Sequence, residues 1–368
     1  MYLMMFFIKS TFLQKNFIKF FEQVESALKK GYNLFMAKIR KLLPFDTKKI
    51  KNMISFLGND EAEKFMRRVL DTSCDLFHYW LPLEVKFKTE SYVLVENGEL
   101  LGMISVKPTY GNPYKLNITR LMFKKDYLAA GKQLVEFILA RYGAKGVQTF
   151  IVSIDDSHDE LLNLFNNGCG FRNCSCEQLW RVNIQDIQDN ISQPNFRLFK
   201  NTDAQAAAML YNDTVITHFK PSMLKTKNEY FDTPFKGLKD GLEWNYVQED
   251  RNLHTLAAYF SIRSLDFTNY IIDITSSIGI SLDYDSILNF AQNEIKKRVK
   301  NYTIFVKTKQ YTEDTKMLEE YLNNKQFSCV QTQNILVKDF YKLIKQPSES
   351  NEIVLFAETT KPVFKIKY

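Results

Sequence analysis

The spacing of hydrophobic residues predicts strands that alternate with helices. Residues 92–106 alternate between apolar and polar positions, which is typical of strands because successive side chains point to opposite faces. The segment 132–142 instead places Leu134, Phe137 and Ile138 on one side of a helix. Between residues 36 and 186 the predicted order is strand, helix, hairpin, strand, helix, strand, helix, strand. This order indicates an α/β fold with a mixed sheet.

Two local signals fix turns within this pattern. Pro44 breaks the first strand near Leu43, and Asp46 is predicted to cap the helix that follows. The dipeptide Asn97-Gly98 separates two alternating runs, which is the strongest short signal for a β-hairpin. Further strands are expected at 115–123 and 147–154, and one or two strands at 170–184.

The second half of the chain repeats the first. Arg40 stands six residues before Asp46, and Arg197 stands six residues before Asp203, so both pairs are offset by 157 positions. A hairpin at 244–262, strands at 270–274 and 302–307 and a helix at 286–299 follow in the order of the first half. We therefore predict two tandem domains, 36–186 and a more divergent 194–345, with an extension at 1–35 and a tail at 346–368 that can add a strand pair.

The extension, residues 1–35, has the pattern of a basic amphipathic helix. Leu13, Phe17 and Phe20 fall on one helical stripe, while lysines interrupt the apolar run well before it could span a bilayer. A helix of this kind can lie on a membrane surface or dock on the protein itself. Docking is favoured, because Glu22 and Glu25 interrupt the basic face.

Charge and cysteine content narrow the class of protein. Residues 1–60 hold eleven lysines and arginines against four acidic residues, which accounts for the entire net charge of +7. The remaining residues are neutral in sum, so nucleic acid is not expected as a partner. An odd count of five cysteines favours a reducing, cytoplasmic compartment. Cys169, Cys174 and Cys176 lack a suitably spaced histidine, so we expect no metal.

The segment "KKDYLAAGKQLV", residues 124–135, begins a helix with unusually small residues. Ala129 and Gly131 leave room for an anion at the free N–H groups and positive dipole of a helix start. Together with "NNGCGF" at 166–171, this pattern resembles the GNAT superfamily of N-acetyltransferases. The resemblance implies that acetyl-CoA is the co-substrate, with its pyrophosphate on this turn. The residues implied in cofactor binding are Phe123, Lys124, Lys125, Tyr127, Leu128, Ala129, Ala130, Gly131 and Lys132.

The sequence departs from the family pattern at two places in the first half. Asp126 stands where the family usually carries Gln or Arg, and nearby lysines can compensate for its charge. Phe165 or Asn166 occupies the region of the family's tyrosine acid. His158 is then the candidate catalytic residue, since an imidazole can take or give a proton near neutral pH.

The second half departs further, because the segment 270–286 has a single glycine, Gly279, and no small-residue turn. Tyr321 is a candidate acid there, although a packing role is favoured. We predict an acyl-CoA-dependent N-acyltransferase that uses the first domain and acetylates an amine of a small molecule or a protein. The alternative is a catalytically silent binding or sensor protein with the same fold.

Overall fold

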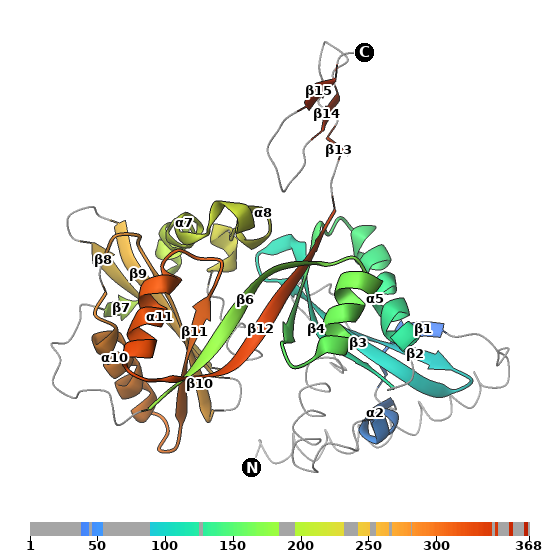
Figure 1. Ribbon diagram of the computed structural model, residues 1–368, viewed down its shortest axis with the longest axis horizontal. Coiled ribbons are helices and arrows are strands. Elements are labelled where there is room, and N and C mark those ends of the chain that lie inside the picture. Colours follow the sequence, from blue (N-terminus) through green and yellow to red (C-terminus); the bar gives the residue numbers. More distant parts are fainter. Residues whose placement is uncertain are drawn as a thin grey trace, which may run out of the picture. The chain divides into compact units, whose positions relative to one another are not determined.

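The computed structural model describes residues 38–43, 46–53, 89–124, 128–183, 196–231, 242–250, 255–264, 267–280 and 282–340, with three short strands of the tail (Figure 1). These residues fall into two compact units. Unit 1 holds the described residues up to Ser105 and the segment Arg120–Phe137. Unit 2 holds Val106–Thr119 and the described residues from Ile138 onward. The predicted extension and the predicted boundary at 187–193 lie outside the described residues.

Unit 1 is built on a predicted hairpin. Strand β1 (Lys38–Lys41) pairs antiparallel with β2 (Glu90–Glu96), and helix α2 (Thr47–Met53) lies between them in sequence. The turn from β2 to β3 (Glu99–Thr109) has φ of 51° at Asn97 and 77° at Gly98, as the Asn-Gly signal requires. Strands β3 and β4 (Asn112–Phe123) and helix α5 (Leu128–Gly143) each contribute residues to both units.

Unit 2 contains a mixed sheet with the strand order β4-β5-β12-β6-β11-β10-β9-β8-β7. The pairs β4–β5 and β10–β11 are parallel, and the other neighbours are antiparallel. The strands are β5 (Thr149–Asp155), β6 (Arg172–Val182), β7 (Phe196–Leu198), β8 (Leu242–Asp250), β9 (Thr255–Ser264), β10 (Asn269–Ser276), β11 (Thr303–Lys309) and β12 (Ser328–Asp339). The predicted strands and the predicted second hairpin are confirmed.

Helices pack on this sheet, and a small sheet follows it. Among the described residues, the helices of unit 2 include, besides α5, α6 (Asp159–Asn163), a π-helical turn at Leu164–Gly168, α7 (Ala204–Thr214), α8 (Lys220–Met223), α10 (Tyr284–Lys296) and α11 (Thr315–Asn324). The sequence pattern did not predict α7 and α8. In the tail, β14 (Ile353–Leu355) pairs antiparallel with β13 (Leu343–Ile344) and with β15 (Phe364–Ile366), as the expected strand pair requires.

The two halves of the chain exchange strands at the centre of the sheet. β12, from the second half, lies between β5 and β6 of the first half, and β6 pairs on its other side with β11 (Figure 1). The ladder from β5 to β12 joins Thr149–Asp155 to Gln333–Asp339 over seven residue pairs. Each half therefore supplies a strand without which the other half would have an open sheet edge.

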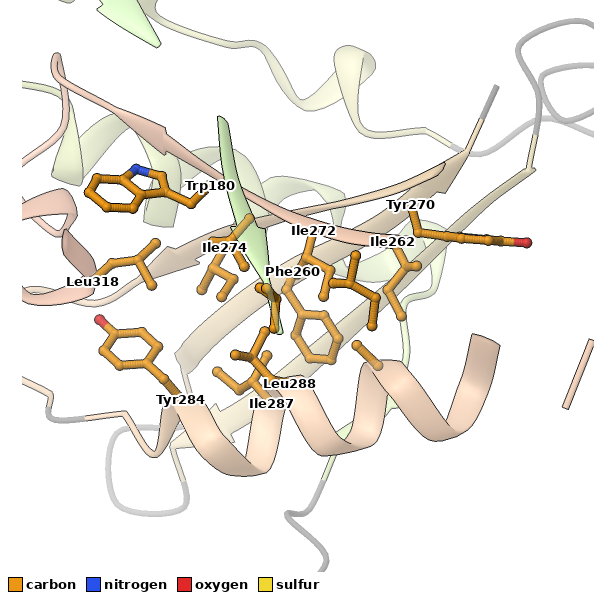
Figure 2. Close-up of a cluster of buried hydrophobic side chains, with 14 of the residues drawn as sticks. Trp180, Phe260, Ile262, Tyr270, Ile272, Ile274, Tyr284, Ile287, Leu288 and Leu318 are labelled. Atoms are coloured by element: carbon orange, nitrogen blue, oxygen red, sulfur yellow. The ribbon is translucent and has the colours of Figure 1, made fainter. Parts of the chain in front are cut away.

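The exchanged strands carry side chains into two hydrophobic cores. Trp180 of β6 packs among the side chains of β9, β10, α10 and α11, where Phe260 and Ile272 have no exposed surface (Figure 2). On the opposite face, Ile335 and Val337 of β12 join a core formed with α7. Burying each of these large side chains stabilises the fold by roughly 1.5–3 kcal/mol, so both cores depend on the exchange.

The repeat seen in the sequence appears as the same contact in both halves. The guanidinium of Arg40 donates to the two carboxylate oxygens of Asp46 at 2.6 and 2.7 Å, and that of Arg197 donates to Asp203 at 2.7 and 2.9 Å. In each case the carboxylate also accepts the backbone N–H three residues upstream, from Leu43 and from Lys200. A bidentate pair at the same offset fixes the entry to the helical segment in both copies.

The tip of the β3–β4 hairpin contacts the segment after α8. Asn112 donates to Glu229 at 3.1 Å, and the ammonium of Lys115 donates to the carbonyl of Leu224. At Gly111, φ is +69°, and a Cβ atom would lie 2.3 Å from the backbone of Asn228. Only glycine permits both this backbone conformation and this close approach.

Replacing Gly111 by Ala should destabilise the protein more than replacing Gly98 by Ala. Both glycines have positive φ, so each substitution costs about 1 kcal/mol of backbone strain. A Cβ at Gly98 meets nothing within 4 Å, whereas at Gly111 it adds overpacking worth about 1–3 kcal/mol. Chemical denaturation of the two variants measures the difference. Equal losses would contradict the proposed contact between the hairpin and Asn228.

Candidate functional site

The predicted cofactor turn leads into α5 with small, buried residues. Ala130 is 3% exposed and Gly131 is buried, while Leu128 and Ala129 face outward. The first turn of α5 contains no acidic residue, so its positive end is not neutralised from within that turn. The position of α5 is set by a tight contact, because a Cβ at Gly102 of β3 would lie 2.9 Å from Leu134. The described residues of this helix start are therefore small and carry no acid in the first turn.

The lysines around this turn have acidic neighbours. The ammonium of Lys124 contacts the carboxylate of Glu99, and that of Lys132 lies 3.8 Å from Glu136 one helical turn later. Both pairs are solvent-exposed in part, so each contributes little to stability and can exchange for a phosphate. Phe123 ends β4, whereas Lys125, Asp126 and Tyr127 lie outside the described residues. Cofactor binding by the residues predicted around this turn stays a prediction.

His158, the predicted catalytic residue, is exposed at the N-terminus of α6 in unit 2. Its backbone N–H donates to the carbonyl of Asp155 at 3.0 Å. The Asp155 carboxylate accepts from the hydroxyl and N–H of Ser157 and from Gln331, and these bonds lower its pKa to about 2, with attraction to His158 adding to the effect. The low pKa keeps Asp155 ionised near neutral pH, and the catalytic role of His158 stays a prediction.

The region of the family's tyrosine holds a core phenylalanine. Phe165 has no exposed surface and packs edge-on against Phe171, with ring centroids 5.0 Å apart. It lies in a π-helical turn, Leu164–Gly168, and its carbonyl accepts the N–H of Phe171. The side chain at this position therefore has no proton to donate and instead holds the short helix on the sheet.

The corresponding helix of the second half begins differently. The carboxylate of Asp283 caps α10 by accepting the N–H of Ser286 at 3.1 Å. Asp285 follows in the first turn, where it accepts from the hydroxyl of Tyr321 at 2.7 Å and pairs with Lys325 at 2.9 Å. Two carboxylates at a helix start repel phosphate and occupy its donors. The hydroxyl of Tyr321 is engaged by Asp285, and burial raises its pKa well above the ordinary value.

A second polar site, which the sequence did not reveal, lies on the α7 face of the sheet in unit 2. We call it the lysine–carboxylate cluster, and it consists of Glu177, Lys225, Asp273, Lys307 and Lys309. Lys307 lies 3.3 Å from both Glu177 and Asp273, and Lys309 also contacts Asp273. The hydroxyl of Tyr311 donates to Glu177 at 2.7 Å. Strands β6, β10 and β11 thus bring charges from three distant segments together.

The electrostatics of the cluster keep its carboxylates ionised. Burial raises the pKa of Asp273, but Lys307, Lys309 and Lys225 together hold it well below its ordinary value. Glu177 behaves in the same way, since burial is outweighed by Lys307 and the bond from Tyr311. Lys225 shows the opposite effect: burial, followed by repulsion from Lys309, lowers its pKa to about 8. Lys225 is therefore the member of the cluster whose charge is least favourable.

One sequence signal for this cluster was available. In "TIFVKTK", Lys307 and Lys309 alternate on one face of a strand whose other positions read as buried. Two lysines on a buried strand face destabilise the folded state unless carboxylates neutralise their charges. Their partners come from strands far away in sequence, so no local pattern identifies them.

Three further features were considered in the sequence: the cysteines, metal-binding groups and membrane-spanning helices. Cys169 and Cys174 are buried and form no disulfide, and burial raises the pKa of the Cys174 thiol. No group of three histidine, cysteine or acidic side chains capable of holding a metal occurs within the part of the chain that the structure describes. The helices described there include none with the length and apolar character that crossing a bilayer would need.

Comparisons with known proteins give a family match for part of the chain and a likeness in fold for most of it. Residues 55–171 match the family model described as acetyltransferase (GNAT) family. A GCN5-related N-acetyltransferase from Sphaerobacter thermophilus superposes with a TM-score of 0.53 at 12% identity, covering 82% of this chain and 95% of that one. A tandem GNAT protein from the clavulanic acid biosynthesis pathway superposes with a TM-score of 0.51 at 8% identity, covering 83% of this chain and 98% of that one. No curated protein is similar enough in sequence to count as a relative.

The family match covers part of the first half, and the likeness in fold to GNAT structures extends over both halves of the chain. The likeness to the solved structures concerns the fold alone at these identities. Acyl transfer is accordingly the general chemistry of the family.

Replacing Lys225 by Met should stabilise the protein at pH 7. The folded state lowers the Lys225 pKa from 10.5 to about 8, so below pH 8 it carries a penalty for the charged lysine that the unfolded state lacks. That penalty is relieved as pH rises from 8 to 10.5. We expect a gain of about 1–3 kcal/mol at pH 7 that shrinks across this range.

The free energy of unfolding, measured for both proteins between pH 7 and 10.5, tests this expectation. Lys227→Met is the matched control, because Lys227 is exposed two residues later. A Lys225→Met variant that is less stable than the parent at pH 7 would show that the ammonium stabilises the fold.

Proposed function

We propose that this protein is an acyl-CoA-dependent N-acyltransferase that transfers an acetyl group from acetyl-CoA to an amine. The observation that carries the proposal is the start of α5, where Ala130 and Gly131 are small and buried and the first turn has no acid. The match to the acetyltransferase family model includes this segment. The N–H groups of the first turn would take the pyrophosphate, with Lys132 beside them.

The reaction makes one bond and breaks another. The neutral amine attacks the thioester carbon, the C–N bond forms, the C–S bond breaks, and the amine's proton must leave while the thiolate gains one. Proximity of the amine to the thioester supplies much of the acceleration in such a transfer. We propose His158 as the proton carrier, because its exposed imidazole can pass the proton to water. The acceptor would be an amine on a small molecule or a protein.

A second candidate function is supported by one observation. The buried Phe165, packed against Phe171, occupies the region of the family's tyrosine acid. A domain without that acid can still bind acetyl-CoA and respond to it. The alternative is therefore a GNAT-fold binding or sensor protein without catalysis.

Calorimetry with acetyl-CoA tests cofactor binding. We expect one molecule per chain, because Asp283 and Asp285 disfavour an anion at the start of α10. Gly131→Val should weaken binding about tenfold or more, equivalent to about 1.4 kcal/mol. Gly143→Val, at the far end of the same helix where a side chain meets nothing within 4 Å, is the matched control and should bind normally. A folded Gly131→Val variant with full affinity would exclude this turn as the cofactor site.

Release of free CoA thiol in the presence of a panel of amines separates the two candidate functions. If the protein is an enzyme, His158→Ala should lower kcat by about 100-fold while leaving the affinity for acetyl-CoA unchanged. His218→Ala, which removes another exposed histidine, should have no effect. Equal rates in the two variants would remove His158 from the mechanism. Binding without turnover for any amine would favour the sensor.

A further inference from the structure

The loop that carries His158 is held by a strand of the second half of the chain. The amide of Gln331 in β12 donates to the Asp155 carboxylate at 2.7 Å. The N–H of Asp156 donates to the carbonyl of Thr332, the next residue of β12, at 3.0 Å. One side-chain bond and one backbone bond therefore attach the loop after β5 to a strand from a distant part of the sequence.

Asp155 transmits this support to His158. One oxygen of its carboxylate accepts the N–H and the hydroxyl of Ser157 at 3.0 and 2.6 Å, and the other accepts from Gln331. Its backbone carbonyl accepts the N–H of His158 at 3.0 Å. A carboxylate that bonds the N–H two residues later fixes the turn that follows it. The position of His158 therefore depends on the orientation of Asp155, which Gln331 holds.

The imidazole of His158 does not take part in holding the loop. His158 is the N-cap residue of α6, yet its side chain makes no capping hydrogen bond. Its carbonyl accepts the N–H groups of Leu161 and Leu162, so the backbone alone begins the helix. The side chain itself is exposed. His158 thus combines a fixed backbone with an accessible imidazole, as a pre-organised functional residue requires.

Gln331 differs from the neighbouring glutamine on the same face of β12. Gln333 stands two residues further along the strand, so its side chain leaves the sheet on the same side. It is paired in register with Asp155, and both glutamines are half-buried. Within the described part of the chain, however, the side-chain bond to Asp155 comes from Gln331. Gln333 is therefore a matched control for Gln331.

We infer that Gln331 is a positioning residue, through which the second half of the protein holds His158 in place for acyl transfer. The inference rests on the proposed function of His158 as the proton carrier. Gln331 acts through Asp155 rather than on the substrate. Its effect is on the rate, because misplacing a reacting group by about 1 Å can slow a reaction about 100-fold. The second half then serves the reaction without a cofactor site of its own.

Steady-state kinetics of the full-length protein test this inference. Gln331→Met keeps the length of the side chain and removes its donor, so we expect kcat to fall about tenfold while KM for acetyl-CoA stays within about twofold. Gln333→Met should keep the kcat of the parent. An unchanged kcat in Gln331→Met, or an equal fall in Gln333→Met, would contradict the positioning role.

Exchanging the two groups distinguishes positioning from a general loss of stability. In the double variant Asp155→Asn/Gln331→Glu, the amide at position 155 can donate to the carboxylate at position 331 while its oxygen still accepts from Ser157. We expect a kcat within about threefold of the parent for the double variant, and about tenfold or more below it for Gln331→Glu alone, where two carboxylates repel each other. Thermal melting confirms that each variant is folded. Equal kcat in the single and double variants would overturn the inference.

The NMR signals of the His158 imidazole give a readout that does not depend on turnover. They should shift in Gln331→Met, return in the exchanged double variant and stay unchanged in Gln333→Met, with His158→Ala assigning them among the four histidines of the chain. If the parent acylates no amine, the proposed function fails, yet a shift that the exchange reverses still supports the positioning of His158. Signals that do not move in Gln331→Met overturn the inference whatever the activity.

Discussion

The insertion of β12 between β5 and β6 is the constraint on which the rest of unit 2 depends. A strand from the end of the second half completes the sheet of the first, and β6 completes that of the second by pairing with β11. Arg172 of β6 and Asp339 of β12 lock the exchange with an ion pair of 2.8 Å. Because both cores receive side chains from the exchanged strands, neither half can close its sheet alone.

The two halves have kept the same framework and diverged in their polar sites. Arg40–Asp46 and Arg197–Asp203 form the same bidentate contact, yet the first turn of α5 has no acid while α10 begins with Asp283 and Asp285. The two helix starts therefore differ in charge by the two carboxylates of Asp283 and Asp285. The second helix start is thus the less favourable of the two for an anion, and the second half carries a polar group of its own, the lysine–carboxylate cluster.

Much of the fold could be predicted from local patterns, and little of the cluster could. The Asn97-Gly98 turn, the helix at 128–143 and the strand pairs of the second half follow from spacing and turn chemistry that neighbouring residues determine. Helices α7 and α8 did not stand out from the sequence. The alanines of α7 are buried in a core with Val247 of β8 and Val337 of β12, strands whose proximity to α7 the local pattern does not encode. Tertiary packing therefore decides that segment.

The sequence by itself determined the class of fold, the repeated order of elements and the place where helix α5 begins, because each of these depends on residues close together in the chain. Tertiary structure alone decided that β6 and β12 exchange partners, since strand pairing is settled by long-range hydrogen bonds and shared cores. It also decided that Lys225 stands beside Lys309 and Asp273. The charge and pKa of such a group depend on neighbours that only the folded chain brings within a few ångströms.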